Sequence, residues 1–292
     1  MPVPVIAISL EDRRIFEETY FSARAQSEAQ AADQGSADWL RARGPLVTAS
    51  IVGAVCGQSP YAIARSIVVD KVALIKKGIK QVPTVHMRYG SLMERAVFEQ
   101  LARLLNVNVV SSRMIVLGSC AYSPDGFVRR GGHCVAAIEI KVASPFAPGY
   151  AFRKFTTIPR PHLFQMLFGA AICARTGRAL EYVLYAFYLK GVLHVATLPL
   201  AGDAGKPFRA LRDALLLSMQ NLFALASHDA PDRIRNVVVH VPAAVDEAVV
   251  RACAAATHTT VLLVEPAEVV ALRAELSQPG ARVFTQPRRA ST

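Results

Sequence analysis

Residues 123–142 read SPDGFVRRGGHCVAAIEIKV, and this stretch carries the strongest structural pattern in the chain. A Ser-Pro-Asp-Gly turn leads into two short runs rich in apolar and β-branched residues, with Gly131-Gly132 between them. Such runs, bounded by turn residues, predict strands. Alternate side chains of a strand share a face, so Glu139 and Lys141 are expected to point the same way. If the two strands pair, the carboxylate of Asp125 reaches the start of that face.

Two carboxylates and one ammonium on a common face form a site for a hard cation. Magnesium prefers oxygen ligands and keeps several waters, which leaves room for a substrate phosphate. A bound ion acidifies its water and stabilises the attacking and leaving oxygens of phosphodiester cleavage. Lys141 would orient or help deprotonate that water, or neutralise charge in the transition state. The spacing therefore predicts metal-dependent phosphodiester hydrolysis.

Each piece also has an ordinary interpretation. Ser-Pro-Asp-Gly is a common turn, and Glu-x-Lys on a strand is commonly a solvated, salt-bridging face. However, Glu139 and Lys141 lie within VAAIEIKVA, where a solvated face would alternate throughout. Charges in so apolar a strand need a partner or a metal ion, which favours the site.

Two helices are expected to add polar groups. Residues 84–105 have helical periodicity, and Glu94 heads an apolar stripe with Phe98, Leu101 and Leu105 that should face the core. Glu94 is therefore a third candidate carboxylate. Pro159 and Pro161 open an apolar helix running to about Thr176, in which Gln165 must be hydrogen-bonded if it is buried. Its partner is either the site or a backbone group.

The remaining elements predict an α/β fold with a central mixed sheet between helices. Strands are expected over 108–117, 120–128 and 134–142, and a hairpin over 181–189 and 192–199. A short helix, a Gly-Pro break and a second helix opened by Thr48 or Ser50 precede them. Further helices are expected within 1–35, 61–77 and 207–227. We assign residues 1–230 to the main domain and 231–292, with a strand-helix-strand-helix pattern from Asn236, to a C-terminal α/β extension that is either a small addition or part of the main sheet.

The chain has 292 residues, a net charge of +11 and a pI of about 9.7. Residues 205–292 hold 10 Lys or Arg and 8 Asp or Glu, so most of the basic excess lies in the first two thirds, with the motifs. Polyanions bind basic surfaces by phosphate neutralisation and counterion release, which makes nucleic acid the leading partner class. Since 52% of residues are hydrophobic and 19% charged, a mostly disordered chain is excluded.

Two other classes of protein are disfavoured. No apolar run approaches the roughly 20 residues that span a bilayer, and the opening MPVPVIAISL lacks the basic start of a signal peptide. The five cysteines form no Cys-x-x-Cys pair, which disfavours disulfides and a thiolate zinc site. A soluble intracellular protein with reduced cysteines is expected, without a membrane partner.

The chain resembles the lambda-type phage exonucleases and viral alkaline nucleases of the PD-(D/E)xK superfamily. Ser123-Pro124-Asp125-Gly126 and Glu139-Ile140-Lys141 match the family's central motifs. Other blocks match in order over roughly residues 36–200: Trp39, Arg43, Thr48 and Ser50 in WLRARGPLVTAS, Gly90 and Glu94 in the G-x-x-x-E helix, Pro145-Phe146, and Gln165. Two departures are the longer Val142-Ala143-Ser144 before the proline, and His162 where the family usually has tyrosine.

The resemblance implies roles for these residues. Asp125, Glu139 and the Ile140 carbonyl would hold Mg²⁺, with Mn²⁺ as a substitute, and Glu94 would complete the metal environment. Lys141 would assist the attacking water. The terminal phosphate and the DNA would be held by Arg43, Ser50, Ser123, Gln165 and His162, where guanidinium and hydroxyl groups suit phosphate oxygens.

The resemblance further implies a 5′→3′ exonuclease on double-stranded DNA ends, for recombination or viral genome processing. An endonuclease acting on DNA or RNA, and a non-catalytic DNA-binding recombination scaffold on the same fold, are the alternatives. Partners implied by the family are a single-strand annealing protein and further copies of the chain in a ring. The compartment would be the bacterial cytoplasm for a phage protein, or the host nucleus for a nuclear-replicating virus.

Overall fold

The computed structural model describes residues 36–200, apart from 45, 60–61, 63–65, 68–69, 72–83, 107 and 119, together with 257–262 and 267–277. The helices expected within 1–35 and 207–227, most of the one over 61–77, and the strand and helix expected between 236 and 256 lie outside these residues.

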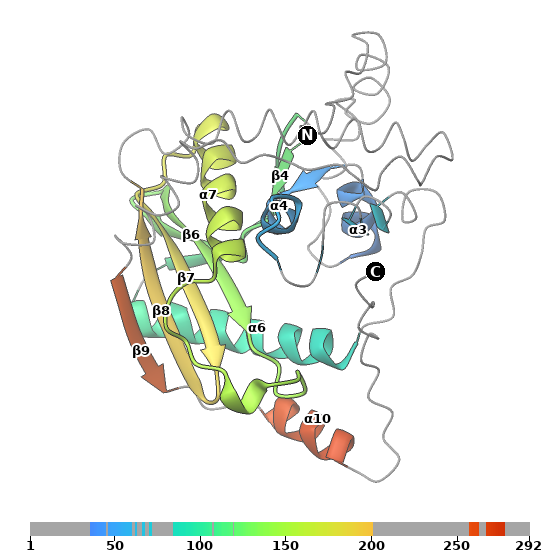
Figure 1. The fold of residues 1–292 in the computed structure, drawn as a ribbon. Coiled ribbons are helices and arrows are strands. Elements are labelled where there is room, and N and C mark those ends of the chain that lie inside the picture. Colours follow the sequence, from blue (N-terminus) through green and yellow to red (C-terminus); the bar gives the residue numbers. More distant parts are fainter. Residues whose placement is uncertain are drawn as a thin grey trace, which may run out of the picture.

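A six-stranded mixed sheet forms the centre of the molecule (Figure 1). In spatial order its strands are β2 (Asn108–Ser111), β5 (Gly126–Arg130), β6 (His133–Val142), β7 (Tyr182–Leu189), β8 (Val192–Pro199) and β9 (Thr257–Leu262). β6 and β7 are parallel, and all other neighbours are antiparallel. A parallel pair needs a long crossover, and here it contains the helix that the Pro159 and Pro161 pattern predicts. The predicted 181–189 and 192–199 hairpin is confirmed as β7 and β8.

A separate three-stranded sheet has the order β1 (Val47–Thr48), β4 (Cys120–Tyr122), β3 (Ile115–Leu117). Two of the strand predictions are therefore wrong in extent, because 108–117 divides into β2 and β3 and 120–128 divides into β4 and β5. The chain passes between the two sheets at 112–114 and again at 123–125. Pro124 has no N–H to donate to a strand ladder, which suits it to the second crossing.

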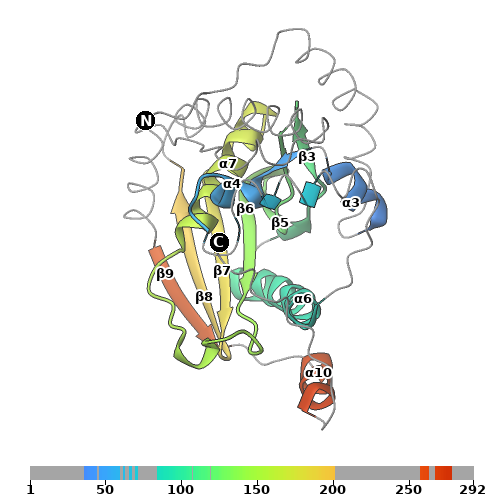
Figure 2. The same ribbon diagram turned by 45° about the vertical axis from the view of Figure 1, so that its right-hand side comes forward.

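Helices cover both faces of the six-stranded sheet, and this confirms the predicted α/β class (Figures 1 and 2). On one face lie α4 (Ala49–Val55) and α7 (Arg160–Arg175), and on the other α6 (Val85–Leu105) and α10 (Ala267–Ser277). α3 (Ala37–Arg43) begins at Ser36, whose side chain accepts a hydrogen bond from Trp39 N–H. A 3-10 turn, η1 (Tyr150–Phe152), lies between β6 and α7.

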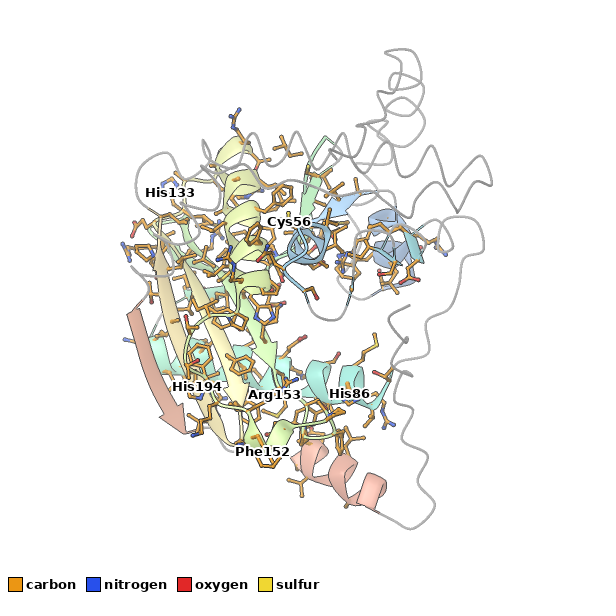
Figure 3. All side chains as sticks on the ribbon, in the orientation of Figure 1. Cys56, His86, His133, Phe152, Arg153 and His194 are labelled. Carbon is orange, nitrogen blue, oxygen red and sulfur yellow. The ribbon has the colours of Figure 1, made fainter. Side chains whose placement is uncertain are left out.

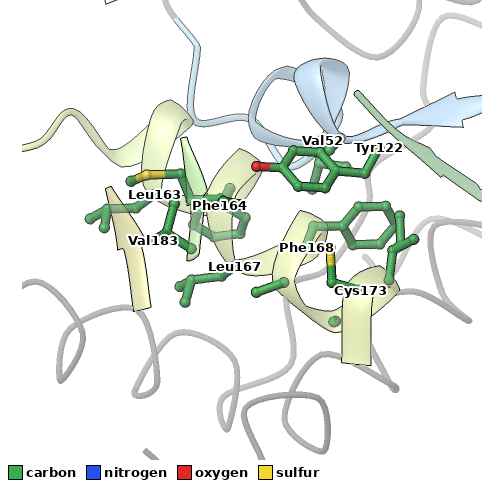
Figure 4. Close-up of a cluster of buried hydrophobic side chains, with 14 of the residues drawn as sticks. Val52, Tyr122, Leu163, Phe164, Leu167, Phe168, Cys173 and Val183 are labelled. Atoms are coloured by element: carbon green, nitrogen blue, oxygen red, sulfur yellow. The ribbon is translucent and has the colours of Figure 1, made fainter. Parts of the chain in front are cut away.

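The core on the α7 face holds α7 and α4 against β4, β7 and β8 (Figure 4). Gly169 permits the closest approach, because a Cβ atom there would lie 2.6 Å from the ring of Tyr122. Phe164, Phe168 and Tyr122 are fully buried in this cluster. The contact with Gly169 therefore fixes the Tyr122 ring between β4 and α7.

The core on the other face is formed by α6. Its buried stripe is Tyr89, Met93, Val97 and Leu101, each with no exposed surface. Of the predicted stripe of Glu94, Phe98, Leu101 and Leu105, Leu101 is confirmed as buried. Met93 and Val97, each one position earlier, take the places predicted for Glu94 and Phe98. Leu105 is 37% exposed, and Glu94 and Phe98 lie half-buried at the edge of the contact. The observed stripe is buried because its side chains pack in one cluster with Ile138 and Ile140 of β6.

The C-terminal residues that the structure describes extend both layers. β9 pairs with β8 along Thr257–Leu262, and Val269 and Leu272 of α10 are buried against the α6 core. No helix in the described ranges is long and apolar enough to cross a membrane. The four described cysteines, at positions 56, 120, 134 and 173, form no disulfide.

Candidate functional site

β6 carries the two central residues on its α7 face. Ala137 of this strand packs into the α7 core, whereas Ile138 and Ile140 point to α6. Alternation then turns Glu139 and Lys141 towards α7. Glu139 is 1% exposed, and the Lys141 ammonium forms a salt bridge with its Oε1. The predicted shared face of these two residues is confirmed.

Two further side chains donate hydrogen bonds to Glu139. Gln165 Nε2 of α7 donates to Glu139 Oε1, and the Tyr122 hydroxyl donates to Oε2 over 3.5 Å. Of the two partners considered for Gln165, the site is therefore the one observed. Burial raises the pKa of Glu139 to about 7, against the opposing effect of Lys141. A cation bound next to this buried carboxylate would favour its ionised form and so lower its pKa.

Asp125 lies where β5 separates from β6. Its N–H donates to Ile138 O over 3.0 Å, and its Oδ2 accepts the Ile140 N–H over 2.6 Å. Glu94 approaches from α6, one turn before Phe98, whose ring would lie 2.5 Å from a Cβ atom on Gly126. Burial raises the pKa of Glu94, and the charge of Asp125 raises it further. Three carboxylates thus influence one another across this edge.

The oxygen donors at this edge suit Mg²⁺ in kind. Among the described residues no three Asp, Glu, His or Cys side chains close around one point. The available donors are Asp125, Glu139 and the Ile140 carbonyl, which here accepts Lys141 Nζ at 3.3 Å. Two carboxylates and a carbonyl leave coordination positions for water and a phosphate, as Mg²⁺ requires. The metal assignment stays a prediction.

A second polar group lies beside the first. β1 runs parallel to β4 with Thr48 opposite Ala121, so Ser50 and Ser123 each follow that pair by two residues. Arg43 Nη2 lies 2.9 Å from Ser50 Oγ and 3.5 Å from Thr48 Oγ1, and the two hydroxyls are 3.1 Å apart. We call Arg43, Thr48, Ser50 and Ser123 the arginine–hydroxyl cluster.

The guanidinium of Arg43 is held in place by an aromatic ring and stays charged. Its guanidinium lies 4.0 Å from the centre of the Trp39 ring, a cation–π contact. Burial lowers the pKa of Arg43 to about 10 while Glu139 raises it, so the group stays charged at neutral pH. Among the described residues, Ser123 Oγ is buried without a hydrogen-bond partner. A buried hydroxyl without a partner, two residues beyond the strand pair that holds Thr48, suits a phosphate oxygen.

His162 also lies in this region, at the start of α7. Its Nδ1 is 2.6 Å from the Tyr185 hydroxyl. Burial lowers the pKa of His162 to about 3, and Lys141 lowers it further. The ring is therefore neutral at physiological pH, and its predicted phosphate contact would be a hydrogen bond without charge.

All of these residues lie in the segment that comparison identifies. Residues 38–179 match the family model of the YqaJ-like viral recombinase domain. This segment of the chain is similar to the YqaJ-like viral recombinase domain. The predicted kinship with the lambda-type exonuclease and alkaline nuclease group is thereby confirmed at the level of the family.

Solved structures similar to this chain include the alkaline exonuclease LHK-Exo from Laribacter hongkongensis, alone and in complex with dAMP. Each shares 19% identity with a TM-score of 0.44, covering 68% of this chain and 94% of that one. SSO0001 shares 10% identity with a TM-score of 0.32, covering 77% of this chain and 89% of its own. No curated protein matches the chain with significance.

The site also contains residues that the sequence did not single out for a role. Thr48 joins the arginine–hydroxyl cluster, and Tyr122 and Tyr185 contact Glu139 and His162. Lys71 Nζ donates to the carbonyls of Arg43, Gly44 and Leu46 at 2.9, 3.1 and 2.6 Å. It thereby caps the end of α3 next to Arg43. Alternation on 181–189 places Tyr185 and Val183 on one face, which was the available signal for Tyr185.

Proposed function

We propose that this chain is a metal-dependent DNA exonuclease that degrades double-stranded DNA from 5′ ends, in recombination or viral genome processing. The observation that carries the proposal is the buried Glu139 carboxylate. It shares a salt bridge with Lys141 at the edge occupied by Asp125, and its charge reaches Arg43. An exonuclease needs a cleavage site and a binding site for a chain end close together, and this arrangement supports a proposal of both.

The side chains suit separate tasks. The arginine–hydroxyl cluster would hold a terminal 5′ phosphate, because a guanidinium grips phosphate oxygens and hydroxyls add neutral donors. Lys141 is 27% exposed, so its ammonium reaches solvent while remaining paired with Glu139. It would orient the attacking water and neutralise charge that develops on the phosphate. Gln165 and Tyr122 would keep Glu139 in a single orientation.

Asp125, Glu139 and the Ile140 carbonyl would hold Mg²⁺, with Glu94 in the surrounding shell. When bound, the ion would supply an acidified water and stabilise charge on the attacking and leaving oxygens.

The test uses a linear duplex with 5′-phosphorylated ends and a matching covalently closed circle, each with Mg²⁺ or with EDTA. We expect Mg²⁺-dependent loss of the linear form alone, with a label on the 5′ end released before one on the 3′ end. Cutting of the circle would instead indicate an endonuclease. Binding without cleavage of either substrate would favour a DNA-binding scaffold.

Variants connect the activity to the residues. Glu139→Ala and Lys141→Ala should abolish cleavage with the fold intact, and Glu99→Ala, which alters an exposed glutamate of α6, is the matched control. Arg43→Ala should reduce cleavage of 5′-phosphorylated ends more than that of 5′-hydroxyl ends. Arg95→Ala, at a side chain that is 83% exposed, should leave that ratio unchanged. Equal losses on both ends would make Arg43 a general DNA contact.

A further inference from the structure

The connection between β6 and α7 holds an apolar side chain in solvent. Phe152 is 88% exposed, the largest exposed fraction among the large apolar side chains that the structure describes. It lies at the lower edge of the molecule in the view of Figure 3, with Arg153 beside it. A single exposed apolar side chain is common on protein surfaces, so the contacts and charges around Phe152 have to carry any functional argument.

The backbone on both sides of Phe152 is fixed by one lysine. Lys190 Nζ, from the β7–β8 turn, donates to Ala151 O over 2.6 Å and to Arg153 O over 3.1 Å. The Lys190 N–H donates to the Tyr150 hydroxyl over 3.0 Å. These bonds hold the carbonyl groups of the two residues on either side of Phe152, so the ring is presented outward from a fixed backbone.

Phe155 anchors the same segment to the sheet next to the candidate site. Its ring centre lies 5.4 Å from that of Phe187 and 4.8 Å from that of His194. Phe187 is the register partner of Lys141. Three residues span at most about 11 Å, so Phe152 lies within a few nucleotides of Lys141 along a bound strand.

The sequence segment that contains Phe152 carries charge of one sign. No Asp or Glu occurs from Lys141 to Leu180, and the same stretch holds Arg153, Lys154 and Arg160. Lys154 and Arg160 are exposed. A cationic segment that offers an aromatic ring matches a single nucleic-acid strand, in which phosphates meet the charges and a base stacks on the ring.

We propose that Phe152 is a stacking contact for an unpaired base of the DNA strand, presented by Lys190 and flanked by Arg153 and Lys154. The contact rests on the proposed nuclease function and extends it. It gives the protein a site for single-stranded DNA next to the place of cleavage, where a strand leaves the duplex.

The test measures binding of the full chain to two fluorescent oligonucleotides in EDTA, by anisotropy. One is oligothymidine, and the other has the same length and charge but abasic sites throughout. Stacking of one base on an aromatic ring strengthens binding by roughly 5- to 100-fold, so the wild type should prefer oligothymidine by about that factor. Phe152→Ala should bind both equally, and Phe152→Tyr should keep the preference.

Two more variants separate presentation from general effects. Lys190→Met should weaken the preference with Phe152 still present, because the flanking carbonyls lose their donor. Leu104→Ala removes an exposed apolar side chain, 45% exposed, from the C-terminal end of α6 and should change nothing. The same preparations are tested for cleavage of the linear duplex.

An unchanged preference in Phe152→Ala would overturn the proposal, as would equal binding of both oligonucleotides by the wild type. If sedimentation shows instead that Phe152→Ala dissociates an oligomer, the ring is a contact between copies and the proposal is wrong. Cleavage by a wild type that shows no base preference would overturn the stacking contact alone. Failure of cleavage, with a base preference lost in Phe152→Ala, would overturn the nuclease function alone.

Discussion

The buried carboxylate of Glu139 should make the stability of the metal-free protein depend on pH. Its pKa is about 7 in the folded protein, against an ordinary value of 4.5. The folded state therefore holds a proton that the unfolded chain releases, so the contribution to stability is fully present below pH 4.5 and is lost as pH rises through 7. At about 1.4 kcal/mol per pH unit, the loss is about 3 kcal/mol.

Glu139→Gln is the appropriate perturbation, because the amide keeps the size of the side chain but cannot ionise. Urea unfolding in EDTA at pH 4.5, 6, 7 and 8 should show the wild type losing about 3 kcal/mol relative to the variant across this range. Mg²⁺ at pH 8 should then stabilise the wild type and not the variant, since it favours the ionised carboxylate. Glu99→Gln should follow the wild type. Parallel pH curves for the wild type and Glu139→Gln would refute the reasoning.

Three further outcomes follow from contacts around the site. Gln165→Leu removes a hydrogen bond that favours ionised Glu139, so the acidic limb of the pH profile for cleavage should move to higher pH. Gly169→Ala forces a Cβ atom against the ring of Tyr122 and should cost about 1–3 kcal/mol in urea unfolding. Lys71→Met leaves three carbonyls without their charged donor, and should cost about 2 kcal/mol and selectively reduce cleavage of 5′-phosphorylated ends.

Each outcome has a comparison. An unchanged pH profile in Gln165→Leu would mean that its amide does not influence ionisation at the site. Gly90→Ala, in α6 with open space around the added Cβ atom, should be neutral or stabilising, and a loss equal to that of Gly169→Ala would argue against the clash. For Lys71→Met, equal losses on phosphorylated and hydroxyl ends would show that Lys71 supports the fold without positioning Arg43.

Local periodicity predicted the parts of the site that one element determines by itself. Strand alternation placed Glu139 and Lys141 on one face, and the paired prolines marked the start of α7 and with it the position of Gln165. The hairpin was predictable because Lys190 and Gly191 separate two apolar runs, the first rich in aromatic residues.

Long-range packing determined the remainder. The division of 108–117 and 120–128 into two strands each depends on a second sheet. No local pattern in residues 108–128 indicates that sheet. Leu105 has helical spacing but extends beyond the part of α6 that meets β6. Lys71 bonds to carbonyls that precede it by at least 25 residues, and Tyr122 meets Glu139 across 17. No local sequence pattern links residues this far apart in the chain, so neither contact could be predicted.

The crossing between the two sheets at residues 123–125 joins the two parts of the site by covalent bonds. Ser123 belongs to the arginine–hydroxyl cluster and Asp125 to the acidic edge, with only Pro124 between them. In the proposed function, the distance from a held chain end to the bond that is cut is therefore set by bond lengths and a proline ring, not by the motion of one domain against another. Because this distance is fixed, every cleavage event should remove a DNA fragment of the same length. Insertions can lengthen the surrounding loops, but an insertion between Ser123 and Asp125 would move the arginine–hydroxyl cluster away from the carboxylates.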